Sequence, residues 1–289
     1  MKRSLLFLML VFMVPPAQAF DLGGVLNAIG GVNGGSSNDA AENFRRIQQG
    51  LKLVQALIPI SDEEEKILGR SVAARVIERF QIADAPEQTY YLNLIGTAIA
   101  QRSDRPEIDY HFAVLATDDV NAYACPGGFI FVTRGVLGMV KDEAELAAVL
   151  AHEIAHVTER HIVKALQQSK IMKVGTEVAA AEFNAPGPLF DAMTQFATDA
   201  LFKGLKKDDE YASDMKSVEY LDRLGYDYPA MFDVLKHLDM RRRMGMTKVL
   251  SKTHPNPKYR LKKIEAASRK MDLDEPTHIR LPERFARHI

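Results

Sequence analysis

The pentapeptide His152-Glu153-Ile154-Ala155-His156 offers two imidazoles and a carboxylate at a spacing that suits metal chemistry. Residues four positions apart share one face of an α-helix, so His152 and His156 can bind one zinc ion together. Glu153 follows the first histidine, within reach of a water beside the ion. The same five residues could also lie on a surface helix whose two histidines bind no metal. The apolar residues between and around the histidines favour the metal site, because buried imidazoles need a partner.

A catalytic zinc ion takes three protein ligands and leaves one position open, so a third ligand must come from elsewhere in the chain. Glu210 is a candidate, because Asp214 follows it one turn later on a predicted helix. One carboxylate can bind the ion while the other, Asp214, accepts a hydrogen bond from a ligating imidazole. With Asp208 and Asp209, these residues could instead form a solvated acidic face. The spacing leaves both interpretations open, and the first predicts one zinc ion per chain.

The elements that must position these residues are mostly helical. Asp142 with Glu145 predicts a capping box, and the apolar periodicity after it predicts a long helix that carries both histidines. Alternating residues predict strands over 110–115 and 128–133. Helical periodicity predicts further helices over residues 40–57, 61–80, 87–102, about 190–223, 228–245 and 256–270. The expected fold class is therefore α+β and predominantly helical, with one small sheet.

The composition and the first residues indicate which partners to expect and whether the chain is exported. The formal net charge of −1 gives no reason to expect nucleic acid as a partner, and 47% hydrophobic residues support a packed core. A basic start, an apolar run and Ala17-Gln18-Ala19 predict a cleavable signal peptide over residues 1–19. Residues 20–38 are expected to form a flexible Gly/Ser-rich leader, and residues 39–289 a single folded domain.

The signal peptide predicts export to the periplasm. We expect no lipid attachment, because no cysteine follows the expected cut, and no transmembrane helix in the mature chain. The single cysteine, Cys125, excludes an intramolecular disulfide, so packing and metal must supply the stability.

Several separated motifs resemble one family, the gluzincin metallopeptidases related to the heat-shock membrane protease, the CAAX prenyl endopeptidase and the mitochondrial inner-membrane stress protease. The resemblance covers roughly residues 61–264. Because the chain shows neither transmembrane helices nor a helical-repeat tail, it resembles the minimal soluble periplasmic branch. The motifs are residues 121–128, 145–152, 157–161 and 210–214, and His254-Pro255 with Arg260.

This resemblance implies a zincin-like gluzincin fold in which an edge strand borders the active-site helix. It implies that Glu210 is the third zinc ligand, beside His152 and His156. It also implies that Asn121, Ala122, Tyr123 and Ala124 form the edge strand that pairs with an extended substrate. A strand edge binds peptide backbone with little dependence on side chains, so broad specificity is expected.

In the expected mechanism zinc polarises the scissile carbonyl, while Glu153 takes a proton from water and delivers it to the leaving amine. The oxyanion needs a further donor, for which His254, Arg260 and Tyr211 are candidates. His254 could also bind the ion as a fourth, inhibitory ligand, or simply cap the following helix. His161 is expected to make a structural hydrogen bond.

We therefore expect a zinc metalloendopeptidase that degrades misfolded or stalled envelope proteins, with possible peripheral contact with the outer-membrane assembly machinery. The alternative is a zinc-containing chaperone or assembly factor for envelope proteins that cuts little. Both would keep the three metal ligands, but only proteolysis needs Glu153.

Overall fold

The computed structural model describes residues 60–169, 187–245, 254, 256–273 and 275–289. The predicted signal peptide, the Gly/Ser-rich leader and the predicted helix over residues 40–57 lie outside the described residues. The boundaries of the single metallopeptidase domain therefore stay a prediction. None of the helices in the described ranges is both long and apolar enough to cross a membrane.

A three-stranded mixed sheet lies at the centre of the described residues, in the order β1-β3-β2. Strand β1 (His111–Leu115) is parallel to β3 (Phe129–Thr133), and β2 (Ala122–Cys125) is antiparallel to β3. The two predicted strands are thus present as β1 and β3. Strand β2 begins one residue later than the resemblance implied. Among the described residues β2 pairs with β3 alone, which places it at an edge of this sheet.

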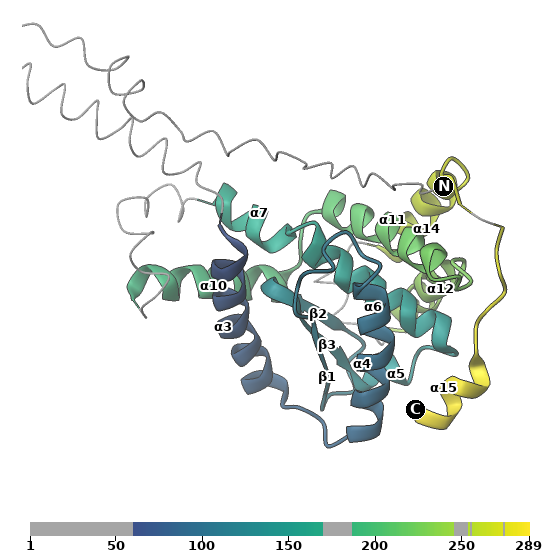
Figure 1. Cartoon of the computed structure of the whole chain (residues 1–289), viewed down its shortest axis with the longest axis horizontal. Coiled ribbons are helices and arrows are strands. Elements are labelled where there is room, and N and C mark those ends of the chain that lie inside the picture. Colours follow the sequence, from purple (N-terminus) through teal and green to yellow (C-terminus); the bar gives the residue numbers. More distant parts are fainter. Residues whose placement is uncertain (1–59, 170–186, 246–253, 255, 274) are drawn as a thin grey trace, which may run out of the picture. The chain divides into compact units, whose positions relative to one another are not determined.

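Alternation along the strands builds two apolar cores, because successive side chains point to opposite faces. One face packs with α4 (Pro86–Ala100) and α6 (Glu143–Thr158), and the other with α3 (Asp62–Phe80), α7 (His161–Gln168) and α10 (Pro188–Lys203). Figure 1 shows α3 on one side of the sheet and α4 with α6 on the other. The first face carries Phe112, Val114, Ala122, Ala124, Ile130 and Val132, and the second carries Leu115, Tyr123, Cys125 and Phe131. Helix α6 is therefore fixed against the sheet.

Helix α6 is the central helix of the fold, since every residue from Glu143 to Val157 is buried. The Asp142 side chain caps it, accepting a hydrogen bond from the Glu145 backbone N–H at 2.9 Å. The predicted capping box is only half formed, because the Glu145 carboxylate accepts from the Lys141 N–H instead, at 2.8 Å. Helices α11 (Lys207–Arg223) and α12 (Ala230–Arg243) both pack against α6. Such all-round burial explains its high content of apolar residues.

The remaining predicted helices need two corrections. The helix expected over 190–223 is two helices, α10 and α11, because Gly204 breaks it with a φ of +94°, a conformation that favours glycine. Helix α14 (Pro257–Ser268) agrees with the prediction, but α15 (Pro282–His288) was not predicted. The predominantly helical α+β class is confirmed.

The C-terminal segment is bound to the start of α6 through ion pairs. Arg284 on α15 donates two hydrogen bonds to the fully buried carboxylate of Glu143, which also accepts from the hydroxyls of Tyr91 and Tyr226. Burial alone would raise the pKa of Glu143, but the hydrogen bonds from Arg284 and the two tyrosines outweigh it and lower this pKa. The segment therefore stabilises the helix that carries the histidines.

We expect Arg284→Met to lower the free energy of unfolding by about 1–3 kcal/mol at pH 7, because it removes a charged partner from a buried carboxylate. A carboxyl whose folded pKa is lowered stabilises the protein above its unfolded pKa of about 4.3, and this contribution is lost as pH falls below that value. The difference from wild type should therefore shrink at pH 4. Urea titrations at both pH values measure it, with the exposed Arg287→Met as control. Equal stability of Arg284→Met and Arg287→Met at pH 7 would contradict the prediction.

Candidate metal centre

Two histidines and one glutamate bring their donor atoms together where α11 packs on α6. His152 and His156 lie one turn apart on α6, with their Nε2 atoms 3.1 Å from each other. Glu210, in the first turn of α11, places Oε2 3.6 Å from Nε2 of His152 and Oε1 3.6 Å from Nε2 of His156. All three side chains are buried. We call His152, His156 and Glu210 the donor cluster.

The donor cluster suits one zinc ion. Ligand atoms that lie about 2.0–2.2 Å from a tetrahedral zinc are about 3.3–3.6 Å from one another, and the pairs here are separated by 3.1–3.6 Å. Two imidazole nitrogens with one carboxylate oxygen are a donor set of catalytic zinc sites.

Each histidine of the donor cluster has a partner at its second ring nitrogen. Nδ1 of His152 lies 3.1 Å from Oδ1 of Asp214, and Nδ1 of His156 lies 2.9 Å from Nδ1 of His161. Such contacts fix the ring orientation and leave Nε2 directed into the cluster. His161 makes the hydrogen bond expected of it, but its partner is one of the candidate ligands, which the sequence did not indicate.

Arg260 of α14 lies behind the donor cluster and joins its carboxylates. Its Nε lies 2.9 Å and its Nη2 2.5 Å from the Asp214 carboxylate, and its Nη1 lies 3.2 Å from Oε2 of Glu210. The guanidinium is buried, so its charge acts on both acids without screening by water. This arrangement holds Glu210 and Asp214 in place.

The charges of these protein groups act strongly on one another. Burial would raise the pKa of Glu210, but His254 and Arg260 hold it well below its usual value. Burial would lower the pKa of His152, but hydrogen bonds to Asp214 and Glu210 raise it to about 9. Burial lowers the pKa of His156 well below its usual value, although Glu210 opposes this effect. Metal binding at His152 must therefore displace a proton at neutral pH.

Glu153 lies where two cavities meet. The strand cavity is lined by Ala122, Tyr123, Ala124, Glu153, His156, Leu201, Gly204, Leu205, Glu210 and His254. The apolar cavity is lined by Val120, Val136, Met139, Val149, Met231, Val234 and Leu238, with Glu153, His152, His254 and Arg260. Burial raises the pKa of Glu153, which makes its carboxylate a better proton acceptor near neutral pH.

Residues 86–268 match the family model described as peptidase family M48. The chain belongs to peptidase family M48. The predicted resemblance to gluzincin stress proteases is thereby confirmed, and the family assignment supports the predicted class of enzyme, a metalloendopeptidase. This family assignment covers the helix of the two histidines, Glu210 and Arg260.

Three relatives of this M48 chain show how its identity to known proteins, and the share of each chain covered, vary. The beta-barrel assembly-enhancing protease of Yersinia pestis is 27% identical over 74% of this chain and 47% of its own length. The mitochondrial metalloendopeptidase OMA1 of Schizosaccharomyces pombe is 29% identical over 61% of this chain and 52% of its own length. Metalloprotease YcaL of Escherichia coli is 25% identical over 72% of this chain and 81% of its own length. The chain thus spans about half the length of the first two.

In the structure of this M48 chain, the predicted edge strand lies beside the donor cluster. Ala122, Tyr123 and Ala124 belong to β2 and line the strand cavity together with Glu153. Asn121 lies immediately before β2, where its backbone N–H donates to the Thr133 hydroxyl at 3.2 Å. Three of the four residues that the resemblance assigns to substrate binding therefore line the strand cavity, and Asn121 directly precedes them.

His254 contacts the donor cluster directly. Its Nδ1 lies 2.6 Å from Oε2 of Glu210, and single donor atoms of His152, Glu210 and His254 lie within 4.8 Å of one another. The interpretation of His254 as a helix cap is wrong. Asn256 caps α14, accepting a hydrogen bond from the Lys258 N–H at 3.0 Å.

We expect Asp214→Ala to weaken zinc binding by about 10–100-fold, because it removes the carboxylate that orients His152 while leaving all three ligands. Competition with a chromophoric chelator measures the affinity. Asp208→Ala, an exposed change on the same helix, is the matched control. Equal affinities of the two variants would remove Asp214 from the metal centre.

We expect His254→Ala to raise peptide turnover several-fold, because a ring that reaches the donor cluster competes with water and substrate for the open position. An oxyanion donor would give the opposite sign, a loss of about 10²–10³-fold. Steady-state rates with one peptide distinguish the two roles. Turnover within twofold of wild type would exclude both.

Proposed function

We propose that this M48 chain is a zinc-dependent endopeptidase of the bacterial periplasm that degrades misfolded or stalled envelope proteins. The observation that carries the proposal is the position of Glu153, a buried carboxylate at the meeting point of two cavities and next to the donor cluster. In this proposal His152, His156 and Glu210 bind one zinc ion, and Asp214 orients His152. The ion would act as a Lewis acid towards the scissile carbonyl.

The side chains of the protein do the remaining work. An extended substrate pairs its backbone with the edge of β2, along Asn121 to Ala124, and so brings a peptide bond to Glu153. Glu153 takes a proton from the attacking water and delivers it to the leaving amine. Arg260 holds Glu210 and Asp214, and His254 borders both cavities. No covalent intermediate is needed.

The first residues and the relatives support the proposed cellular role. The basic and apolar first residues favour export, and relatives named beta-barrel assembly-enhancing protease favour clients that belong to the envelope, near the outer-membrane assembly machinery. A backbone-directed edge strand suits unfolded clients, because a folded protein offers few unpaired extended segments.

Digestion of an unfolded protein tests the proposed activity. Zinc-loaded enzyme should cut casein into internal fragments, a chelator should stop the digestion, and added zinc should restore it. Mass spectrometry of the products separates internal cleavage from trimming at the ends. Casein that stays intact with the zinc-loaded protein would refute the endopeptidase proposal.

A further inference from the structure

The chain turns at Arg160, between the end of α6 and the start of α7. Arg160 has a φ of 55° and a ψ of 38°, the left-handed conformation, which is sterically costly for a residue with a side chain. A residue keeps this conformation only where the surrounding structure fixes it, and such residues cluster at functional sites. The next residue is His161, whose Nδ1 lies 2.9 Å from Nδ1 of His156. The turn thus decides where the neighbour of a candidate zinc ligand lies.

The contact between the two histidines orients His156. A neutral imidazole that binds a metal through Nε2 carries its proton on Nδ1, so His156 donates this hydrogen bond and His161 accepts it. A partner at the second ring nitrogen fixes the tautomer and the orientation of a ligating histidine. His161 is buried, with its Nδ1 3.5 Å from the Ser213 hydroxyl and its Nε2 3.8 Å from Oδ1 of Asp209. The ring is therefore held against α11 as well as against His156.

Backbone hydrogen bonds hold both sides of the turn. The Arg160 N–H donates to the Val157 carbonyl at 3.0 Å, and the Arg160 carbonyl accepts from the Lys164 N–H at 2.8 Å. Both bonds use backbone atoms alone, so a glycine at this position could also make them, and glycine adopts the left-handed conformation without steric cost. These bonds do not explain an arginine at this position, so the contacts of its side chain must.

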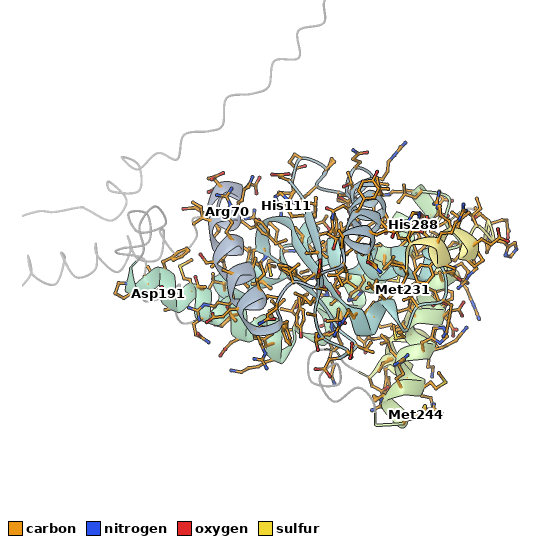
Figure 2. The ribbon with its side chains drawn as sticks, turned by 90° about the horizontal axis from the view of Figure 1, so that it is seen from below. Arg70, His111, Asp191, Met231, Met244 and His288 are labelled. Carbon is orange, nitrogen blue, oxygen red and sulfur yellow. The ribbon has the colours of Figure 1, made fainter. Side chains whose placement is uncertain are left out.

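The Arg160 side chain reaches the start of α3. Its Nη2 donates to the carbonyl of Ile60, and its Nε lies 3.0 Å from Oε2 of Glu65. Its Nη1 lies 3.6 Å from Oδ1 of Asp62, whose side chain is 60% exposed, whereas Glu65 is fully buried. The buried pair is screened less by water, so Glu65 is the stronger charged partner. Figure 1 shows the start of α3 close to α7, and Figure 2 shows α3, marked by Arg70, alongside the sheet.

Glu65 is itself fixed from two further directions. The Arg105 guanidinium lies 3.2 Å from Oε2 and 3.3 Å from Oε1 of Glu65, and the Gly127 N–H donates to Oε1 at 3.3 Å. Arg105 also donates to the carbonyl of Val157, in the last turn of α6, at 3.1 Å. The Glu65 carboxylate therefore joins α3 to the turn that follows β2 and to the end of the helix of the two histidines. It is a fixed point against which Arg160 can be held.

We propose that Glu65 and Arg160 are positioning residues of the metal centre. Their buried ion pair holds the left-handed turn, and the turn holds His161 as the hydrogen-bond acceptor that orients His156. The inference rests on the proposed zinc centre. It predicts that the affinity for zinc depends on the conformation at position 160, and on Glu65 only as far as Glu65 maintains that conformation.

Two substitutions at position 160 separate the conformation from the side chain. Both Arg160→Gly and Arg160→Val remove the guanidinium and leave Glu65 paired with Arg105. Glycine adopts the left-handed conformation readily, whereas β-branched valine does not. The zinc affinity of Arg160→Gly should therefore stay within about threefold of wild type, and that of Arg160→Val should fall by about 10–100-fold. Competition with a chromophoric chelator measures both affinities, at a temperature where thermal unfolding shows each variant to be folded.

A double-mutant cycle tests the part of Glu65. Glu65→Gln keeps the shape of the side chain but removes the charge that pairs with Arg160, so zinc affinity should fall by about tenfold. In the Arg160→Gly background the turn needs no such partner, so the same change should cost less than about twofold. Glu63→Gln, the same change at an exposed position of α3, is the matched control and should bind zinc as wild type does.

The outcomes separate the positioning role from the metal centre itself. Zinc affinities of Arg160→Gly and Arg160→Val within twofold of each other would overturn the inference and leave the zinc centre intact. An equal loss from Glu65→Gln in both backgrounds would also overturn it, because Glu65 would then act by a route other than the turn. If Arg160→Val does not fold, the cycle with Glu65→Gln decides alone. A wild-type protein that binds no zinc would refute the proposed centre, and the inference with it.

Discussion

Glu153→Gln is expected to lower peptide hydrolysis by about 10²–10⁴-fold and to leave zinc content at one ion per chain. Glutamine keeps the shape of the side chain but cannot take a proton at neutral pH. Glu153 lies outside the donor cluster, so His152, His156 and Glu210 should bind zinc unchanged. The variant therefore separates proton transfer from metal binding.

Rates with a fluorogenic peptide and metal analysis of the same sample measure both properties. Glu159→Gln, just after the end of α6, is the matched control and should behave as wild type. Equal rates of wild type and Glu153→Gln would mean that the hydrolysis does not use this site. If neither protein cuts unfolded clients but both bind them, the chaperone or assembly-factor function replaces the peptidase proposal.

The sequence predicted the elements whose signals are local. The helix of the two histidines follows from its apolar periodicity and its Asp142 cap, and the strands β1 and β3 from alternation. The two histidines share a helix, so their proximity also follows from spacing. Glu210 is different: spacing left it open between a ligand and a solvated acid, and only the resemblance to the family favoured the ligand.

The features that the sequence missed depend on contacts between distant segments. His161 reaches His156 because Arg160 adopts a left-handed conformation, with φ of 55°, between α6 and α7. Arginine carries no signal for that turn, unlike glycine at Gly204. Helix α15 is short, and its role depends on Glu143, more than a hundred positions earlier in the chain. Such pairings leave no periodic pattern.

The sequence likewise did not show that apolar side chains of α12 line a cavity. Periodicity predicted a helix over 228–245. In the structure Met231, Val234 and Leu238 of this helix are buried, as on any helix that packs on a core. Only the packing of α12 on α6 shows that these residues border a cavity that opens at Glu153. A sequence pattern distinguishes buried from exposed positions, but it does not distinguish a residue packed in the core from one that lines a pocket.

Glu210→Gln is expected to abolish stoichiometric zinc binding, because the third donor of the cluster becomes a neutral amide. The loss of a charged ligand should cost several kcal/mol of binding, and a cost of about 4 kcal/mol corresponds to an affinity about 10³-fold lower. Arg260 keeps its pair with Asp214 in this variant, so the buried guanidinium retains one partner and the fold should persist. The defect should therefore be confined to the metal centre.

Metal analysis after dialysis against buffered zinc measures the occupancy, and thermal unfolding of the same samples checks the fold. His156→Ala should lose zinc in the same way, since it removes a different ligand of the same ion. Glu219→Gln, further along α11 and paired only with Lys216 and Arg223 among the described contacts, should keep one ion per chain. Near-stoichiometric zinc in both Glu210→Gln and His156→Ala would mean that the ion binds elsewhere, because each change removes one of the three ligands of the proposed centre.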